Sequence, residues 1–176
     1  AAGFVCLSLS ALWMHYENTY DTMHKDYERI YAFIEPSFVG YTGDAWYDNH
    51  LLARVGLYEK LRDEYPEVEA VTCCKKIMGP KIINGIEAKA LQVDSTFIRV
   101  FSLPLVDGDY DFLTDEKEVA ITEEFAQRLF PKDTEVIGNK VSFSHGFIAE
   151  VGAVIKDYGE HSIFQFDIVH TGSNDS

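Results

Sequence analysis

Residues 118–130, EVAITEEFAQRLF, carry the local signal that decides the fold class. Glu118–Ile121 is rich in β-branched residues and has the length of a short strand. Thr122 is a favoured N-cap, the two glutamates after it suit the positive end of a helix, and Arg128 suits the negative end. Pro131 then ends the helix. The stretch predicts a strand that leads directly into a compact helix.

The segments around this unit mix helices and strands without a regular alternation. The predicted strands are Ile30–Ile34, Val68–Ile77, Lys81–Val93, a strand with Val141 and Phe143, Ile148–Ile155 and a strand with Phe164, Phe166 and Ile168. The predicted helices are an amphipathic one with apolar residues from Leu51 to Tyr65, and a short one with Phe97, Val100 and Phe101, which Asp94 would cap. We therefore expect an α+β fold, with a mixed, largely antiparallel sheet or sheets packed with a few helices.

The N-terminal 14 residues, AAGFVCLSLSALWM, are uncharged. A helix that spans a membrane needs about 20 residues, so this run is either the end of a membrane helix or a buried helix of a soluble domain. In the first case Trp13 and Tyr16 would lie at the membrane interface. The residues that follow contain neither Gly nor Pro, so we expect one continuous helix from Phe4 to Arg29.

Composition limits the class of protein. The 176 residues fit one domain or two small lobes, and 47% of them are apolar, enough for a packed core. The net charge of −14 disfavours nucleic acid as a partner. Cys73 and Cys74 are adjacent and Cys6 lies in the apolar run, so we expect buried thiols and no disulfide framework.

The residues 107–118, DGDYDFLTDEKE, space their carboxylates like those of a calcium loop. Position 6 of such a loop needs Gly for a sharp turn, and Phe112 stands there instead. We interpret Asp107–Glu118 as a solvated acidic loop between two elements, with a calcium site as the open alternative.

Other motifs of catalysis or metal binding are missing from the sequence. The six histidines are scattered and none forms HExxH, although His145 and His161 flank predicted strands and could meet in space. Ser102 and Ser162 have no motif around them that suggests activation by a base. The sequence therefore predicts no catalytic residue, no cofactor-binding residue and no metal ligand.

Residues 16–31, YENTYDTMHKDYERIY, resemble a signature of MacB-like periplasmic core domains, which follows the first transmembrane helix of FtsX-type ABC transporter permeases. Thr19 replaces the usual Ser of this signature, and Met23 replaces the usual Phe. Further segments resemble the family in the same order along the chain: 65–71 (YPEVEAV), 93–105 (VDSTFIRVFSLPL) with Gly108-Asp109, 119–123 (VAITE), 129–130 (LF), 138–140 (GNK), 151–157 (VGAVIKD) and 166–167 (FD). The long form of the signature is similar to permeases of the Bacteroidetes type.

This resemblance implies a non-catalytic part of a transporter in the bacterial inner membrane. Residues 1–14 would be the end of a truncated transmembrane helix, and residues 15–176 a periplasmic domain that the family normally continues beyond Ser176. A separate cytoplasmic ABC ATPase would hydrolyse ATP, and the dimeric permease would couple hydrolysis to export or to a periplasmic protein, lipoprotein or peptide. The resemblance also makes Asp107–Glu118 an ordinary connection.

Two other classes of protein stay open on the residues alone. A membrane-anchored receptor could use the same domain to bind a ligand or sense a signal, and the full-length gene would then encode one membrane helix and a signalling region. A soluble enzyme would need a convergent polar pocket, which the sequence does not indicate.

Overall fold

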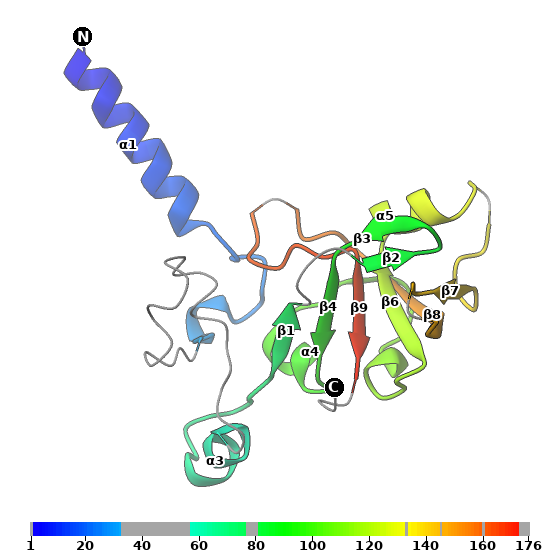
Figure 1. The fold of residues 1–176 in the computed structure, drawn as a ribbon. Coiled ribbons are helices and arrows are strands. Elements are labelled where there is room, and N and C mark those ends of the chain that lie inside the picture. The colour runs from blue at the N-terminus through cyan, green and yellow to red at the C-terminus, as the bar shows by residue number, and fades with distance from the viewer. Residues whose placement is uncertain are drawn as a thin grey trace.

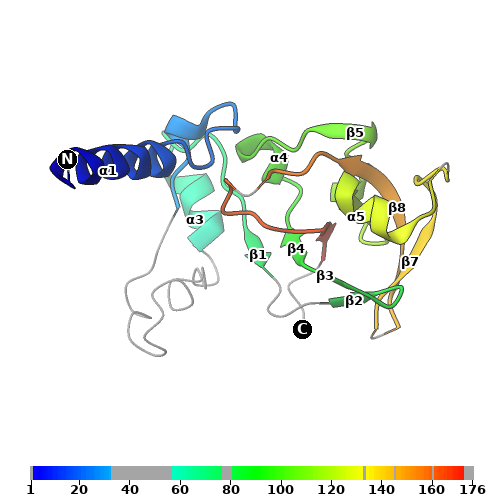
Figure 2. The same ribbon diagram turned by 90° about the horizontal axis from the view of Figure 1, so that it is seen from above.

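The computed structural model describes residues 2–32, 57–76, 81–132, 134–144, 146–159 and 161–172. Most of the described residues form one body built around a sheet, and α1 (Ala2–Asn18) projects away from it in both views (Figures 1 and 2). The sequence also predicts a loop from Ser37 to about Asp48. This loop and the first part of the predicted helix, up to residue 56, lie outside the described residues.

Within the described ranges, seven strands form the main sheet in the order β1-β4-β9-β6-β8-β5, with β7 also paired to β8. Their bounds are β1 Cys74–Lys76, β4 Ala90–Val93, β5 Leu105–Gly108, β6 Glu118–Thr122, β7 Lys140–Ser142, β8 Ile148–Ile155 and β9 Ile168–Thr171. The pairs β4–β9 and β6–β8 are parallel, and the others are antiparallel. The predicted α+β class with a mixed, largely antiparallel sheet is confirmed.

Both faces of this sheet are covered, which is why consecutive residues of the central strand β6, Val119 to Ile121, are all apolar and buried. In β6, Val119 and Ile121 belong to the core beneath α5 (Glu123–Leu129), whereas Ala120 belongs to the core on the opposite face. The opposite core also holds Phe97 of α4 (Phe97–Val100) and Phe112 of the 3₁₀ helix η3 (Asp111–Leu113). Alternating side chains of one strand thus serve two cores.

A β-bulge at Gly152 changes the faces along β8. The β6–β8 register runs from Val119 opposite Val151 to Ala120 opposite Ala153, so Gly152 is the extra residue. Before the bulge Val151 packs in the core under α5, and after it Ala153 packs in the opposite core.

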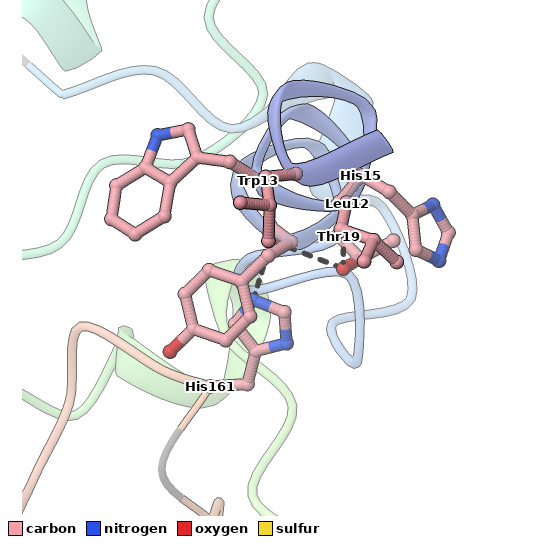
Figure 3. Close-up of a pocket in the computed structure, with 7 residues that line it drawn as sticks. Leu12, Trp13, His15, Thr19 and His161 are labelled. Carbon is pink, nitrogen blue, oxygen red and sulfur yellow. Dashed lines mark hydrogen bonds between the residues drawn. The ribbon is translucent and has the colours of Figure 1, made fainter. Parts of the chain in front are cut away.

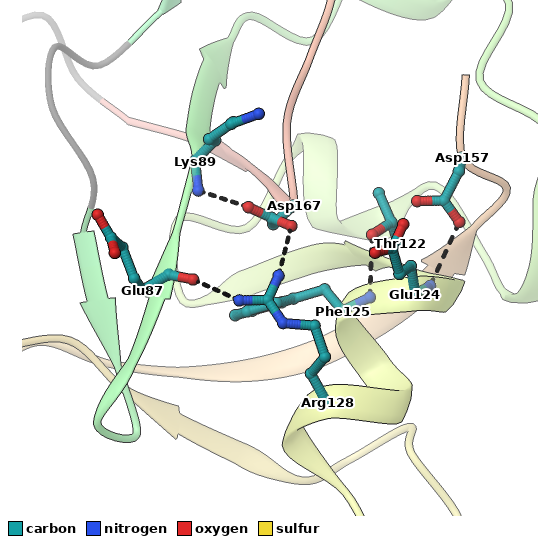
Figure 4. A network of polar contacts seen from close by, with 8 residues as sticks. All are labelled: Glu87, Lys89, Thr122, Glu124, Phe125, Arg128, Asp157 and Asp167. Carbon is teal, nitrogen blue, oxygen red and sulfur yellow. Dashed lines mark hydrogen bonds and ion pairs between the residues drawn. The ribbon is translucent and has the colours of Figure 1, made fainter. Parts of the chain in front are cut away.

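The unit formed by β6 and α5 agrees with its prediction. The Thr122 hydroxyl accepts a hydrogen bond from the Phe125 amide (3.2 Å), as expected of an N-cap. At the other end of α5, Arg128 donates to the Asp167 carboxylate (3.1 Å) and to the Glu87 carbonyl (2.8 Å), and Asp167 also accepts from the Lys89 amide (2.7 Å; Figure 4). Arg128 therefore joins α5 to Glu87 and to Asp167, the residue that directly precedes β9.

Several predicted boundaries are wrong because turns interrupt the patterns. Lys81–Val93 is not one strand: β2 (Lys81–Ile83) and β3 (Ile86–Ala88) form a hairpin, and β4 follows. The turn places Asn84 and Gly85 at φ values of 48° and 82°, the conformation of the favoured two-residue hairpin turn.

Other elements are shorter than predicted. Of residues 68–76, the described part of the predicted strand Val68–Ile77, only β1 is a strand, and residues 30–32 are not strand. In the described part of the predicted Leu51–Tyr65 helix, the helix is α3 (Leu57–Glu64). Phe164 and Phe166 precede β9 as irregular chain, since their rings pack against the core instead of alternating across a ladder. The N-cap position of α4 is Thr96 and not Asp94, although the Asp94 carboxylate accepts from the Thr96 amide (3.0 Å) just before the helix. The same carboxylate also accepts from the Thr72 hydroxyl (2.8 Å) and the Cys73 amide (2.8 Å).

Candidate functional site

Helix α1 is apolar but packs against little of the body. Phe4, Leu7, Leu12 and Trp13 are 75%, 69%, 65% and 65% exposed. Its apolar side chains lie on all sides instead of forming one stripe, which is typical of a helix surrounded by apolar material. Among the described residues, no helix has both the length and the apolar character needed to cross a membrane.

The point where α1 joins the body is the candidate site, and we call it the helix junction. It consists of the turn of residues 19–25, Phe101 and Ser102, and the loop of residues 158–164, of which residue 160 is outside the described set. Its three segments are far apart in the sequence and meet only in the folded chain.

The predicted continuous helix from Phe4 to Arg29 is wrong, because α1 ends at Asn18. The Thr19 hydroxyl donates to the carbonyls of His15 (3.0 Å) and Tyr16 (3.1 Å), which satisfies acceptors at the helix end. Asp21 has a φ of +56°, a conformation that cannot continue a right-handed helix. The chain then turns, and a short 3₁₀ helix, η1 (Tyr27–Arg29), follows.

Asp21 attaches this turn to the 158–164 loop. Its carboxylate accepts hydrogen bonds from the Ser162 hydroxyl (2.7 Å) and the Ile163 amide (3.0 Å), and its own amide donates to the His161 carbonyl (3.2 Å). The Tyr20 hydroxyl donates to the Ser162 carbonyl (3.2 Å). Ser162 is fully buried, so these bonds lie partly out of water, where they contribute more to stability than at an open surface.

Aromatic contacts continue this attachment along α1. The His161 ring stacks on Tyr16 with centroids 4.2 Å apart, and its Nε2 lies 2.6 Å from the Tyr16 carbonyl oxygen. Trp13 lies next to Tyr16 on the helix, at 6.1 Å between ring centroids. A pocket opens here, and Figure 3 shows His161 reaching the helix from the loop. The pocket is lined by Leu9, Leu12, Trp13, His15, Tyr16, Thr19 and His161.

His24 is the buried centre of the helix junction, with 2% of its surface exposed. Three rings surround its imidazole: Phe101 at 5.1 Å, Tyr158 at 5.3 Å and Phe164 at 6.3 Å between centroids. Its Nδ1 accepts a hydrogen bond from the Ser102 amide (3.2 Å). Burial lowers the pKa of His24, and the nearby Asp21 carboxylate opposes this effect. The neutral ring is therefore favoured in the fold.

The other polar groups at this centre are directed at Ser102. Its hydroxyl accepts from the Lys25 amide (3.1 Å), and its carbonyl accepts from the Tyr158 hydroxyl. Burial raises the pKa of Tyr158, which keeps that hydroxyl protonated as a donor. Ser102 Oγ thus bonds to a backbone amide, and Ser162 Oγ bonds to a carboxylate, so neither hydroxyl pairs with a histidine base.

The acidic loop has a structural role that its sequence only partly shows. Phe112 and Leu113 are buried in the core, which explains the apolar residue where a calcium loop needs Gly. The Asp109 and Asp115 carboxylates accept from the amides of Asp111 (2.8 Å) and Lys117 (2.8 Å) and so support turns. Within the described ranges, no three His, Cys, Asp or Glu side chains are placed to hold a metal ion.

Of the other histidines and cysteines considered in the sequence, His15 and His161 line the same pocket. His15 lines the pocket beside α1, His161 contacts the helix instead of a second histidine, and His145 lies outside the described residues. Cys6 and Cys73 are exposed, so the expectation of buried thiols is wrong for both. Cys74 is half-buried, and burial above all raises the pKa of its thiol to about 12.

The sequence signature contained the residues of the helix junction without showing what they contact. Tyr20, Asp21, His24 and Ser102 lie in segments that resemble the family, whereas His161 and Ser162 lie outside those segments. Asp21 and Ser162 are 141 positions apart, and no periodicity relates two such segments. The one available signal was the run of polar and aromatic residues directly after an apolar helix.

Comparison with known proteins agrees with this architecture. The family described as "MacB-like periplasmic core domain" matches residues 1–172. No curated protein matches the chain. Among solved structures, a domain of a putative permease protein from Porphyromonas gingivalis is 22% identical with a TM-score of 0.55, and the similarity covers 66% of this chain and 51% of that one.

Two further structures are similar at the level of the fold. The extracellular domain of the noncanonic ABC-type transporter YknZ from Gram-positive bacteria is 20% identical (TM-score 0.52; 65% of this chain and 59% of that one). The periplasmic region of MacB from Actinobacillus actinomycetemcomitans is 16% identical (TM-score 0.54; 74% of this chain and 60% of that one). The similarity thus spans about half to three fifths of the length of these structures.

The family match covers nearly the whole chain, and the fold of its relatives has the same mixture of helices and sheet. The resemblance that the sequence signature indicated is confirmed. The chain belongs to the family of MacB-like periplasmic core domains.

Proposed function

We propose that this chain is the non-catalytic extracytoplasmic domain of an ABC transporter permease in a bacterial inner membrane, with residues 1–14 as the end of a membrane helix. The family match supports the class of protein. The observation that carries the proposal is α1 itself, an apolar helix that is exposed along its length and attached to the body only where it ends. Such a helix suits a lipid environment, since burying its apolar side chains in lipid is favourable.

The helix junction would make the body of this domain move together with the membrane part of the permease. The Asp21 carboxylate binds the 158–164 loop, and the turn at His24 and Lys25 binds Ser102. A displacement of α1 would therefore act on two segments that both pack against the core below α4, where Phe101 and Phe164 lie. A cytoplasmic ABC ATPase would drive this displacement, and the body would transmit the movement to a bound periplasmic protein, lipoprotein or peptide.

The test is to express the full-length gene product with an affinity tag and to identify what co-purifies from detergent-solubilised membranes. Recovery of an ABC ATPase is the expected result. Recovery from the soluble fraction, or from the membrane with a kinase and without an ATPase, would overturn the proposal and favour a receptor that senses or binds a ligand.

A further inference from the structure

His24 is unusual among the residues of the helix junction because one of its polar atoms is buried without a partner. In the part of the chain that the structure describes, Nε2 is the one buried side-chain nitrogen or oxygen with no hydrogen bond. Ordinary apolar packing would be served by a phenyl ring at this place, since three aromatic rings already surround it. The presence of a histidine here is therefore explained by the hydrogen bond that its other ring nitrogen accepts.

That nitrogen, Nδ1, can accept the Ser102 amide only if it carries no proton. The proton of the neutral ring must then lie on Nε2, the atom without a partner. The arrangement leaves one buried donor unpaired in order to make one particular acceptor available. This acceptor faces the backbone amide that directly follows Phe101, at the end of the segment containing α4.

Ser102 is bound to the turn after α1 at two points, through its amide to His24 and through its hydroxyl to the Lys25 amide. The Asp21 carboxylate binds the same turn to Ser162 and Ile163. Two separate attachments hold the turn that directly follows α1 against the body, whereas one attachment would leave a hinge there, and the stack of His161 on Tyr16 adds a contact on the helix itself. Removing the His24 contact would leave the bond from the Lys25 amide to the Ser102 hydroxyl as the one hydrogen bond of the second attachment, beside that of Asp21.

We infer that His24 is a positioning residue: its Nδ1, by accepting the Ser102 amide, sets the direction of α1 relative to the sheet. The inference rests on the proposed function in one respect: the direction of α1 would matter because α1 transmits movement from the membrane part to the body. Two substitutions separate this role from packing. His24→Phe keeps an aromatic ring and removes the acceptor, whereas His24→Asn removes the ring and places an amide oxygen close to the position of Nδ1.

The direction of α1 can be measured in the chain itself by pulsed electron paramagnetic resonance in lipid nanodiscs. One spin label is attached to the native, exposed Cys6 on α1, and the other to Glu116→Cys in an exposed turn of the body. Cys73→Ser and Cys74→Ala remove the other thiols. A second pair of labels, at Glu116→Cys and Lys132→Cys in a Cys6→Ala background, reports whether the body is intact.

We expect a narrow distance distribution in the parent and in His24→Asn, and one about twofold broader in His24→Phe, with the body pair unchanged in all three. Nitrogen NMR of labelled histidine should show Nδ1 unprotonated in the parent. A distribution in His24→Phe as narrow as in the parent, a broad one in His24→Asn, or a protonated Nδ1 would each overturn the inference. Because the measurement needs no ATPase, its failure is distinguishable from failure of the transporter proposal.

Discussion

At the scale of single residues, Gly108 and Gly85 have nearly the same φ angle and can be compared directly. Both have positive φ values, 80° and 82°, which favour glycine. They differ in their surroundings: a Cβ on Gly108 would fall on the Gly152 carbonyl and lie 2.9 Å from Ala153 Cα, whereas a Cβ on Gly85 would meet nothing within 4 Å. Gly108 thus permits the close approach of β5 to the bulge in β8.

Alanine at these two positions should separate backbone strain from collision. We expect Gly85→Ala to lower the free energy of unfolding by about 1 kcal/mol, the usual cost of the left-handed conformation. Gly108→Ala should lower it by about 3 kcal/mol or more, because the strand must also move. Urea unfolding followed by circular dichroism measures both. Equal losses would show that the β5–β8 contact is not tight.

The burial of His24 predicts a dependence of stability on pH. Its pKa is lowered in the fold from the ordinary value of 6.5, so the unfolded chain binds more protons below that value. The stabilisation is fully present above pH 6.5 and is lost as the pH falls from 6.5 through the lowered pKa of the folded state. Urea midpoints of the parent should therefore decline relative to those of His24→Asn in that window.

Because both proteins share every other titrating group, their difference isolates His24. A parent and a His24→Asn variant that lose stability in parallel below pH 6.5 would contradict a buried neutral ring.

At the scale of elements, α5 depends on Arg128. This side chain pairs with Asp167 just before β9, bonds the Glu87 carbonyl in β3, and lies over the Phe125 ring at 5.1 Å (Figure 4). It therefore connects α5 to β3 and to the residue that precedes β9, which lie 41 and 39 positions away in the sequence.

We expect Arg128→Ala to lower the free energy of unfolding by about 1–2 kcal/mol, since a charged hydrogen bond and a bond to a backbone carbonyl are lost. Arg62→Ala is the control, because the pair Arg62–Asp63 is exposed on both sides at 56% and 59% and should give no measurable change in the urea midpoint. Equal midpoints for the two variants would show that Arg128 contributes only at the surface.

At the scale of the whole molecule, the proposed function requires that α1 and the body move together. In a His161→Ala background, which removes the contact with Tyr16, a flexible Gly/Ser insertion between Asn18 and Thr19 should separate them, since it falls where α1 ends and before the contacts of Asp21. In the full-length complex, spin labels at Glu116→Cys on the two copies should report a change of distance on ATP binding. The insertion should abolish that change while ATP hydrolysis continues.

The same insertion in the exposed turn between Asn84 and Gly85 is the control, and it should leave the change on ATP binding intact. A change of distance that survives insertion after Asn18 would refute mechanical transmission through α1.

The amino-acid sequence by itself determined the elements whose signals are local. The strand and helix at residues 118–129, the Thr122 cap, the strand Ile148–Ile155 and the class of fold follow from nearest-neighbour chemistry: β-branched residues, a capping hydroxyl and a terminal proline. The ordered signature segments were enough to indicate the family, because each reflects a local turn or strand of that fold.

Only the tertiary structure decided where α1 ends and what its end binds. Every residue from His15 to Arg29 tolerates a helix, so nothing local stops it; the turn is stabilised by bonds from Asp21 to Ser162 and Ile163 and from His24 to Ser102, partners that lie 141, 142 and 78 positions away. The energy of such contacts does not exist until the chain is folded, which is why no pattern of spacing could have predicted the helix junction.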